Sequence, residues 1–302
     1  MSLASPAALA LALALAQTGT APYVRSRSQD TQYTPPACLY WTAPTLTWQQ
    51  STAGNPGTTG DTEFGAVSAA FQTWENQFAA CGNLNLVEGA RVADRRVGYN
   101  PTQANRNLVL FRTQACKGTV PDTNACWTDE SCANTYDCWA FDDNVIGITT
   151  VSYDVRTGVI YDADIELNAA RFNFTAVDSP CGGVPGSLGC TSTDIQNTVT
   201  HEAGHFIGLD HSSVSGSTMA PDARTGETSK RVLDDASKRF VCEVYPKGQP
   251  SVSCVDRLPT PEGSAGGDGG GGGCASGAGL APSLLGALAL LPLLRRRRAR
   301  RA

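Results

Sequence analysis

The sequence predicts one α+β domain with tails at both ends. Short apolar or alternating runs predict strands, and stretches with helical spacing or capping residues predict helices among them. The chain has 302 residues, 41% of them hydrophobic, which is enough for the core of one ordinary domain. Ten of its eleven cysteines lie between Cys38 and Cys254. This even number indicates an exported domain held by disulfides.

The first predicted elements are a strand and a helix. Residues 38–48 contain aromatic and apolar runs and predict a strand that Pro44 interrupts. Asp61 is placed to cap a helix that runs through Gln77. The apolar side chains of this helix form one stripe, which we expect in the core: Phe64, Val67, Phe71 and Trp74.

The middle of the chain predicts further strands around one irregular region. Residues 84–87 and 108–111 are short apolar runs typical of strands. Residues 116–138 contain four cysteines and little periodicity, so we expect a loop held by disulfides. Residues 145–153 and 159–168, joined by a turn, predict a hairpin.

The second strand of this hairpin alternates between an apolar and an acidic face. The apolar face carries Val159, Tyr161, Ala163, Ile165 and Leu167, and the opposite face carries Ile160, Asp162, Asp164, Glu166 and Asn168. Because hard cations bind several oxygens, the acidic face predicts a calcium site, with further oxygens on Asp142, Asp143 and Asn144. The alternative is a strand face exposed to solvent, and both interpretations stay open.

Residues 201–211 carry the most specific pattern of the chain, H-E-x-x-H-x-x-G-x-x-H. Positions i and i+4 lie on one face of a helix, so His201 and His205 can bind one metal ion. Gly208 comes one turn later, where a helix can stop because glycine tolerates positive φ. The chain can then bring His211 back as a third ligand.

The elements around this pattern complete the prediction. Ser192 or Thr193 can cap the helix, and Asp194 suits its positive end. Residues 220–231 predict a loop, of which we expect 220–230 to shape the substrate pocket, and residues 233–246 predict a last helix.

Glu202 decides between a catalytic and a structural metal site. Three protein ligands leave a fourth position on zinc for water, which is typical of catalytic zinc, and Glu202 can serve there as the general base. A lone His-x-x-x-His pair usually marks a polar helix face, but all three histidines of the chain fall in this pattern. The competing function is a surface adhesion or binding module with a structural zinc, for which Glu202 would be dispensable.

The eleven residues of the pattern resemble the zinc motif of the metzincins, and Ser217-Thr218-Met219-Ala220-Pro221 resembles the Met-turn that follows it. Ser212, directly after the third histidine, is similar to the matrixins, which comprise the matrix metalloproteinases and bacterial relatives. The resemblance covers residues 38–246. It implies a zinc endopeptidase with a twisted mixed sheet, three helices and a cleft between two lobes. It also implies that Met219 lies beneath the zinc without touching it.

The same resemblance implies a substrate and a metal content. One strand of the predicted hairpin is similar to the matrixin edge strand that pairs with extended substrate, so the expected partner is a protein or peptide. Vertebrate matrixins carry a second, structural zinc bound mainly by histidine, and no histidine remains here for it. We therefore expect one catalytic zinc in a monomer.

The disulfide connectivity does not follow from the sequence, because ten cysteines allow about 945 pairings. Proximity along the chain alone suggests three pairs: Cys132–Cys138, Cys181–Cys190 and Cys242–Cys254.

The two ends of the chain predict export and anchoring. Residues 1–16 resemble a signal peptide, and residues 17–37 follow as a linker. The expected peptidase domain takes residues 38–247, a Gly-rich linker takes 248–274, and a sorting or transmembrane tail takes 275–302.

The tail combines an apolar run with a cluster of arginines. The run 275–294 can span a bilayer, and the arginines within 295–301 would keep that end inside. With Gly-Gly-Cys before it, the tail resembles the sorting tails called MYXO-CTERM, which implies processing near Cys274 and anchoring at the cell surface. Without the six tail arginines, 17 basic residues face 28 acidic ones, a balance of −11. This balance argues against nucleic acid as a partner.

Overall fold

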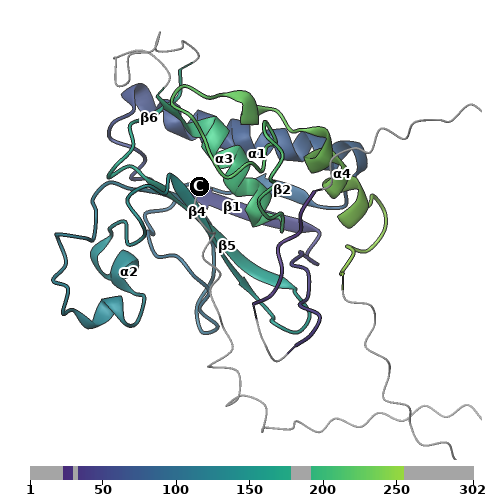
Figure 1. The fold of residues 1–302 in the computed structure, drawn as a ribbon, viewed down its shortest axis with the longest axis horizontal. Coiled ribbons are helices and arrows are strands. Elements are labelled where there is room, and N and C mark those ends of the chain that lie inside the picture. The colour runs from purple at the N-terminus through teal and green to yellow at the C-terminus, as the bar shows by residue number, and fades with distance from the viewer. Residues whose placement is uncertain (1–22, 30–32, 178–191, 255–302) are drawn as a thin grey trace, which may run out of the picture.

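The computed structural model describes residues 23–29, 33–177 and 192–254. They form a sheet with long helices on one face and a smaller disulfide-rich region beside it (Figure 1). The predicted signal peptide and the predicted tail lie outside these residues. Within the described part of the chain, no helix is long and apolar enough to cross a membrane.

Five strands form one mixed sheet in the order β2-β1-β3-β5-β4. Four of them run parallel, and β4 runs antiparallel to β5 at one edge. The first strand begins later than predicted, directly after Pro44, which lacks the N–H that a strand ladder needs. The strands are β1 Thr45–Gln50, β2 Asn85–Glu88, β3 Asn107–Arg112, β4 Gly147–Tyr153 and β5 Ile160–Asn168, with a separate short pair of β6 Phe174–Thr175 and β7 Thr193–Asp194.

An aromatic layer fixes the helices over the sheet. Trp48 of β1 stacks on Phe71, with ring centroids 3.9 Å apart, and Phe71 meets Phe206 edge-on. The indole Nε1 of Trp74 donates to the carbonyl of Thr200 at 2.9 Å, which joins the first long helix to the third. The helices are α1 Thr62–Cys81, α2 Cys132–Tyr136, α3 Ile195–Phe206 and α4 Asp235–Val244. The predicted α+β class with a mixed sheet is thus confirmed.

Two helices begin differently from the prediction. Asp61 stands before α1 with φ 57°, and its side chain makes no capping hydrogen bond, because capping needs an extended backbone at that position. The side chain of Asp194 caps α3 by accepting from the N–H of Asn197. Neither Ser192 nor Thr193 is the cap, since β7 is extended and pairs with β6.

The structure contains four disulfides among the described residues: Cys38–Cys254, Cys81–Cys242, Cys116–Cys138 and Cys126–Cys132. The suggested pairs Cys132–Cys138 and Cys242–Cys254 are therefore wrong. Proximity along the chain fails because packing of α4 against α1 brings together cysteines 161 residues apart. The suggested pair Cys181–Cys190 lies outside the described residues and stays a prediction.

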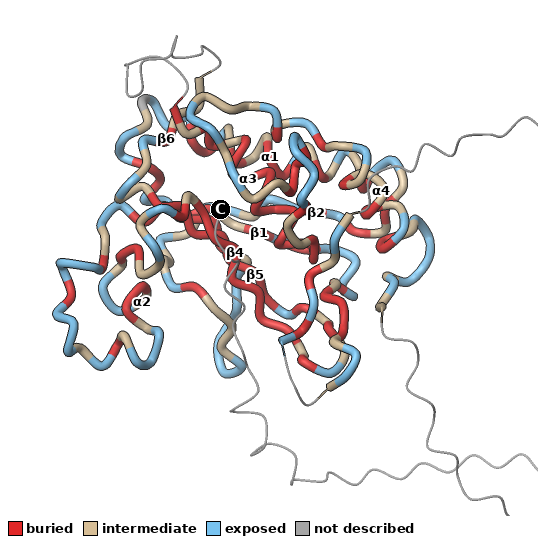
Figure 2. Tube along the Cα trace, viewed as in Figure 1, coloured by how far each residue is buried: buried red, intermediate tan, exposed pale blue. Residues whose placement is uncertain are grey.

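The acidic face of β5 is buried. Figure 2 marks most of β4 and β5 as buried. The carboxylate of Asp164 accepts hydrogen bonds from the backbone N–H groups of Gly98 and Leu108. Burial, together with the neighbouring Asp162, raises the pKa of Asp164 well above its usual range. The interpretation as a solvent-exposed face is therefore wrong, because the chain before β3 covers it.

A buried arginine neutralises part of this face. Arg112 donates from Nε to Glu166 and from Nη1 to Asp137, both at 2.6 Å, and Arg95 binds the second oxygen of Asp137. Ion pairing offsets part of the cost of burying the charges of Arg112 and Glu166. The carboxylates of the described residues do not gather into a group of three metal-ligating side chains, so calcium stays a prediction without a ligand set.

Candidate metal centre

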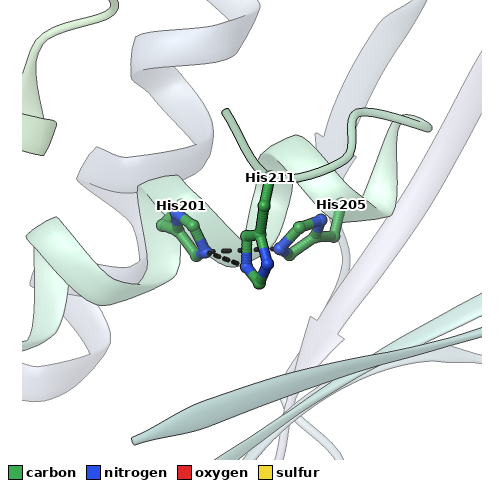
Figure 3. A group of neighbouring side chains, drawn as sticks. All are labelled: His201, His205 and His211. Carbon is green, nitrogen blue, oxygen red and sulfur yellow. Dashed lines mark hydrogen bonds between the residues drawn. The ribbon is translucent and has the colours of Figure 1, made fainter. Parts of the chain in front are cut away.

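Three histidines converge at the end of α3 and in the loop after it (Figure 3). His201 and His205 project from successive turns of the helix, and His211 comes from the loop. The Nε2 atom of His201 lies 3.2 Å from that of His205 and 3.2 Å from that of His211. Tetrahedral zinc with bonds of about 2.0–2.1 Å separates its ligand nitrogens by about 3.3 Å. Both distances from His201 match this spacing, and the ligand atoms of all three histidines lie within 4.8 Å of one another, so the group can hold one zinc ion.

Hydrogen bonds to the other ring nitrogens orient two of these imidazoles. Nδ1 of His201 lies 2.8 Å from the carbonyl oxygen of Thr218, and Nδ1 of His205 lies 2.8 Å from that of Leu209. A proton on Nδ1 leaves Nε2 with its lone pair free for a metal. Burial, with a further contribution from the neighbouring His205, lowers the pKa of His201 well below its usual range. The ring is thus held neutral, as a metal ligand must be.

The turn that returns His211 depends on Gly208. This residue has φ +98°, and a Cβ there would lie 2.5 Å from the carbonyl oxygen of Leu39. Both the backbone conformation and the close approach require glycine. The pattern's fixed glycine therefore ends α3 and sets the path to the third ligand.

A segment near the N-terminus braces the same turn. The N–H of Ser26 donates to the carbonyl of Gly208 at 2.8 Å, and its hydroxyl donates to the carbonyl of Leu209 at 2.7 Å. The N–H of Asp210 donates to the carbonyl of Val24 at 2.8 Å. This segment lies within residues 17–37, where we expect a linker, and no sequence pattern marks its contacts with the metal centre.

Met219 packs against α3 at Gly204, and its position beneath a bound zinc stays a prediction. It is 2% exposed, and its carbonyl accepts from the N–H of Ser212, which follows the third ligand. A Cβ on Gly204 would collide with Sδ of Met219 and would lie 3.2 Å from the ring of Trp74. Position 204 can vary within the zinc pattern, but here Met219 leaves room only for glycine.

Gly204→Ala tests this packing. We expect the free energy of unfolding to fall by about 1–3 kcal/mol, because an added methyl group overpacks a closed site, and zinc affinity to fall with it. Denaturant unfolding and zinc titration measure the two effects. Gly65→Ala in α1 is the matched control: its Cβ meets nothing within 4 Å, so it should be neutral or stabilise the helix by up to about 1 kcal/mol. Equal unfolding midpoints for the two variants would contradict the packing argument.

Glu202 lies beside the histidines and outside the ligand group. Its side chain is buried, and the hydroxyl of Thr149 on β4 donates to its Oε2 at 2.7 Å. Burial raises the pKa of Glu202 to about 7, while Thr149 and Lys230 act in the opposite direction. A carboxylate in this position can accept a proton near neutral pH.

Residues between Ala220 and Ser229 form one wall of an open hollow of about 660 Å³. The segment directly after His211 forms the facing wall. The buried ammonium of Lys230 donates to the carbonyls of Ala220 and Asp222, both at 2.7 Å. The backbone N–H of Lys230 donates to the side chain of Asn197 on α3. The predicted pocket loop is thus tied to the zinc helix by a lysine that the sequence does not single out.

A mixed sheet under α3, with two histidines on that helix and a third from the loop after it, is consistent with a metzincin-type metallopeptidase fold. Residues 113–246 match the family model described as Matrixin. The match includes β4, β5, the three histidines, Met219 and α4, and begins directly after β3. No curated protein matches the chain. The matched region and the triad together support a zinc-dependent protease that acts on protein or peptide substrates.

Proposed function

We propose that this protein is an exported, surface-anchored zinc endopeptidase. The observation that carries the catalytic part is the convergence of three imidazoles, with Nε2 of His201 3.2 Å from that of His205 and of His211, and with Glu202 outside the ligand group. Structural zinc sites take four protein ligands. Within the described residues, only these three side chains gather, which leaves a position for water.

Each residue of the site has a defined task in this proposal. His201, His205 and His211 would hold the zinc, which when bound would supply a Lewis acid for the scissile carbonyl and would lower the pKa of water. Glu202 accepts the proton of the attacking water and returns it to the leaving amine. Met219 supports the ligands from below without contacting the substrate.

The edge strand β4 offers a binding mode for an extended substrate. It is the last strand of the sheet and packs beside α3, so its outer backbone groups are placed to pair with a peptide next to the metal centre. Strand addition uses main-chain hydrogen bonds, and pockets for alternate side chains then give specificity. The hollow beside the 220–230 loop is the pocket we assign to one such side chain.

Removal of the metal tests the proposed function. Purified protein should contain about one zinc per chain and should digest a broad peptide library. A chelator should abolish cleavage and lower stability, because ligand binding to the folded state contributes to its free energy, and added zinc should restore both. Cleavage that persists in metal-free protein would refute the proposal. A stable, zinc-loaded protein that cleaves no peptide would favour the alternative of a surface binding module.

Export and anchoring are proposed on composition. The apolar stretch before Gln17 supports a signal peptide, and the run 275–294 between Cys274 and the arginines supports an anchor. We expect mass spectrometry of the protein from the cell surface to find the arginine end removed and Cys274 at or near the new end. An intact C-terminus in the membrane fraction would point to a plain transmembrane anchor.

A further inference from the structure

β4 approaches Glu202 closely through two of its residues. Successive side chains of a strand alternate between faces, so Gly147 and Thr149 lie on the same face of β4. The hydroxyl of Thr149 is 2.7 Å from Oε2 of Glu202 and 3.0 Å from the carbonyl oxygen of Glu202. Thr149 is 2% exposed, so water does not compete for this contact.

Gly147 lies against the other oxygen of the same carboxylate. A Cβ at this position would stand 3.0 Å from Oε1 of Glu202 and 3.3 Å from its Cδ and Cγ. Its backbone does not have a positive φ, so the close approach, and not conformational freedom, favours glycine here. On β4, the Thr149 hydroxyl thus binds Oε2 of Glu202, and the absence of a side chain on Gly147 leaves room for Oε1.

We propose that Thr149 is a positioning residue for the proton transfer that Glu202 performs. Its hydrogen bond fixes the carboxylate through Oε2 and leaves Oε1 to take the proton from water. Among the described residues, Thr149 is the side chain that hydrogen-bonds this carboxylate. The inference rests on the proposed function, since it presupposes that Glu202 is the base.

The arrangement links the base to the strand that we assign to substrate. Glu202 belongs to α3, but the hydrogen bond that holds its carboxylate comes from β4. A shift of β4 when a peptide pairs with its edge would therefore be transmitted to Glu202. Small displacements of a catalytic group cost large factors in rate, on the order of 10²-fold for about 1 Å.

Thr149→Val removes the hydroxyl and keeps the shape of the side chain, whereas Thr149→Ser keeps the hydroxyl. We expect kcat of Thr149→Val to fall by about 10- to 100-fold, with KM and zinc content unchanged, and Thr149→Ser to remain within a few-fold of the parent. Thr73→Val is the matched control: Thr73 of α1 also donates to backbone carbonyls, of Ala69 and Arg231, but makes no contact with Glu202. It should leave kcat unchanged.

Gly147→Ala provides a second test, because its added methyl group would crowd the carboxylate while the Thr149 hydroxyl is kept, and it should also lower kcat at constant zinc content. Full activity of Thr149→Val would overturn the inference, as would loss of zinc or folding that Thr149→Ser failed to rescue. Glu202→Gln separates the two levels of the argument. If it is inactive while Thr149→Val is fully active, only the positioning role falls. If Glu202→Gln is as active as the parent, Glu202 is not the base and its role in the proposed function falls, whereas the peptidase function itself is tested by removal of the metal.

Discussion

Glu202→Gln is expected to retain zinc and to lose peptide hydrolysis by about 10² or more. The amide keeps the size of the carboxylate but cannot accept the proton of the attacking water. Glu202 stands outside the histidine group, so the metal should stay bound. Zinc content by elemental analysis and single-substrate peptide cleavage measure the two properties on the same sample.

His205→Ala is the matched control for this prediction. It removes one of three ligands, and the two that remain hold zinc poorly, so both metal and activity should be lost. The two variants thus separate base from ligand. A Glu202→Gln protein that cleaves peptides as fast as the parent would show that the carboxylate is not the base.

The pH profile should identify the same group. Burial raises the pKa of Glu202 to about 7 in the metal-free site, and a bound dication draws it lower because it favours the charged form. Activity should therefore fall as pH decreases through a pKa below 7, where the base becomes protonated. Glu202→Gln should lack this acidic limb in its residual activity.

The metal centre was predictable because its geometry is local. His201 and His205 share a helix face through a spacing of four residues, and Gly208 sets the turn to His211 within the same eleven residues. The spacing therefore predicts that the three side chains converge, although contacts from Ser26 and Thr218 help to hold them in place. The family resemblance singled out Met219. It did not predict that Met219 leaves room only for glycine at position 204, because that contact joins two separate segments of the chain.

The buried polar face of β5 was not predictable in the same way. The alternation of side chains along a strand places Asp162, Asp164 and Glu166 on one face of β5, but it does not predict which residues cover that face. Arg112 and the backbone of Gly98 cover it, and both come from earlier in the chain. Thr149 was missed for the same reason, because its partner Glu202 is 53 residues away in sequence.

Loss of the Cys81–Cys242 disulfide is expected to lower stability far more than loss of Cys126–Cys132. This bond joins the end of α1 to α4 across 161 residues. In the chain-entropy model, closing a loop of that length in the unfolded state stabilises the fold by about 5 kcal/mol, compared with about 2.4 kcal/mol for the six-residue separation of Cys126–Cys132. A typical domain has a net stability of only about 5–15 kcal/mol.

The double variants Cys81→Ser/Cys242→Ser and Cys126→Ser/Cys132→Ser should therefore differ clearly in their denaturant midpoints. Each removes one disulfide by the same chemical change, so the difference reports on loop length and on the elements joined. The first pair ties α4 to α1, which packs against the zinc helix, so zinc affinity should fall along with stability. The second pair closes a loop within the disulfide-rich region beside the sheet and should leave zinc affinity unchanged. Equal midpoints would mean that packing of α4 on α1, and not the covalent link, holds the closing helix against the domain.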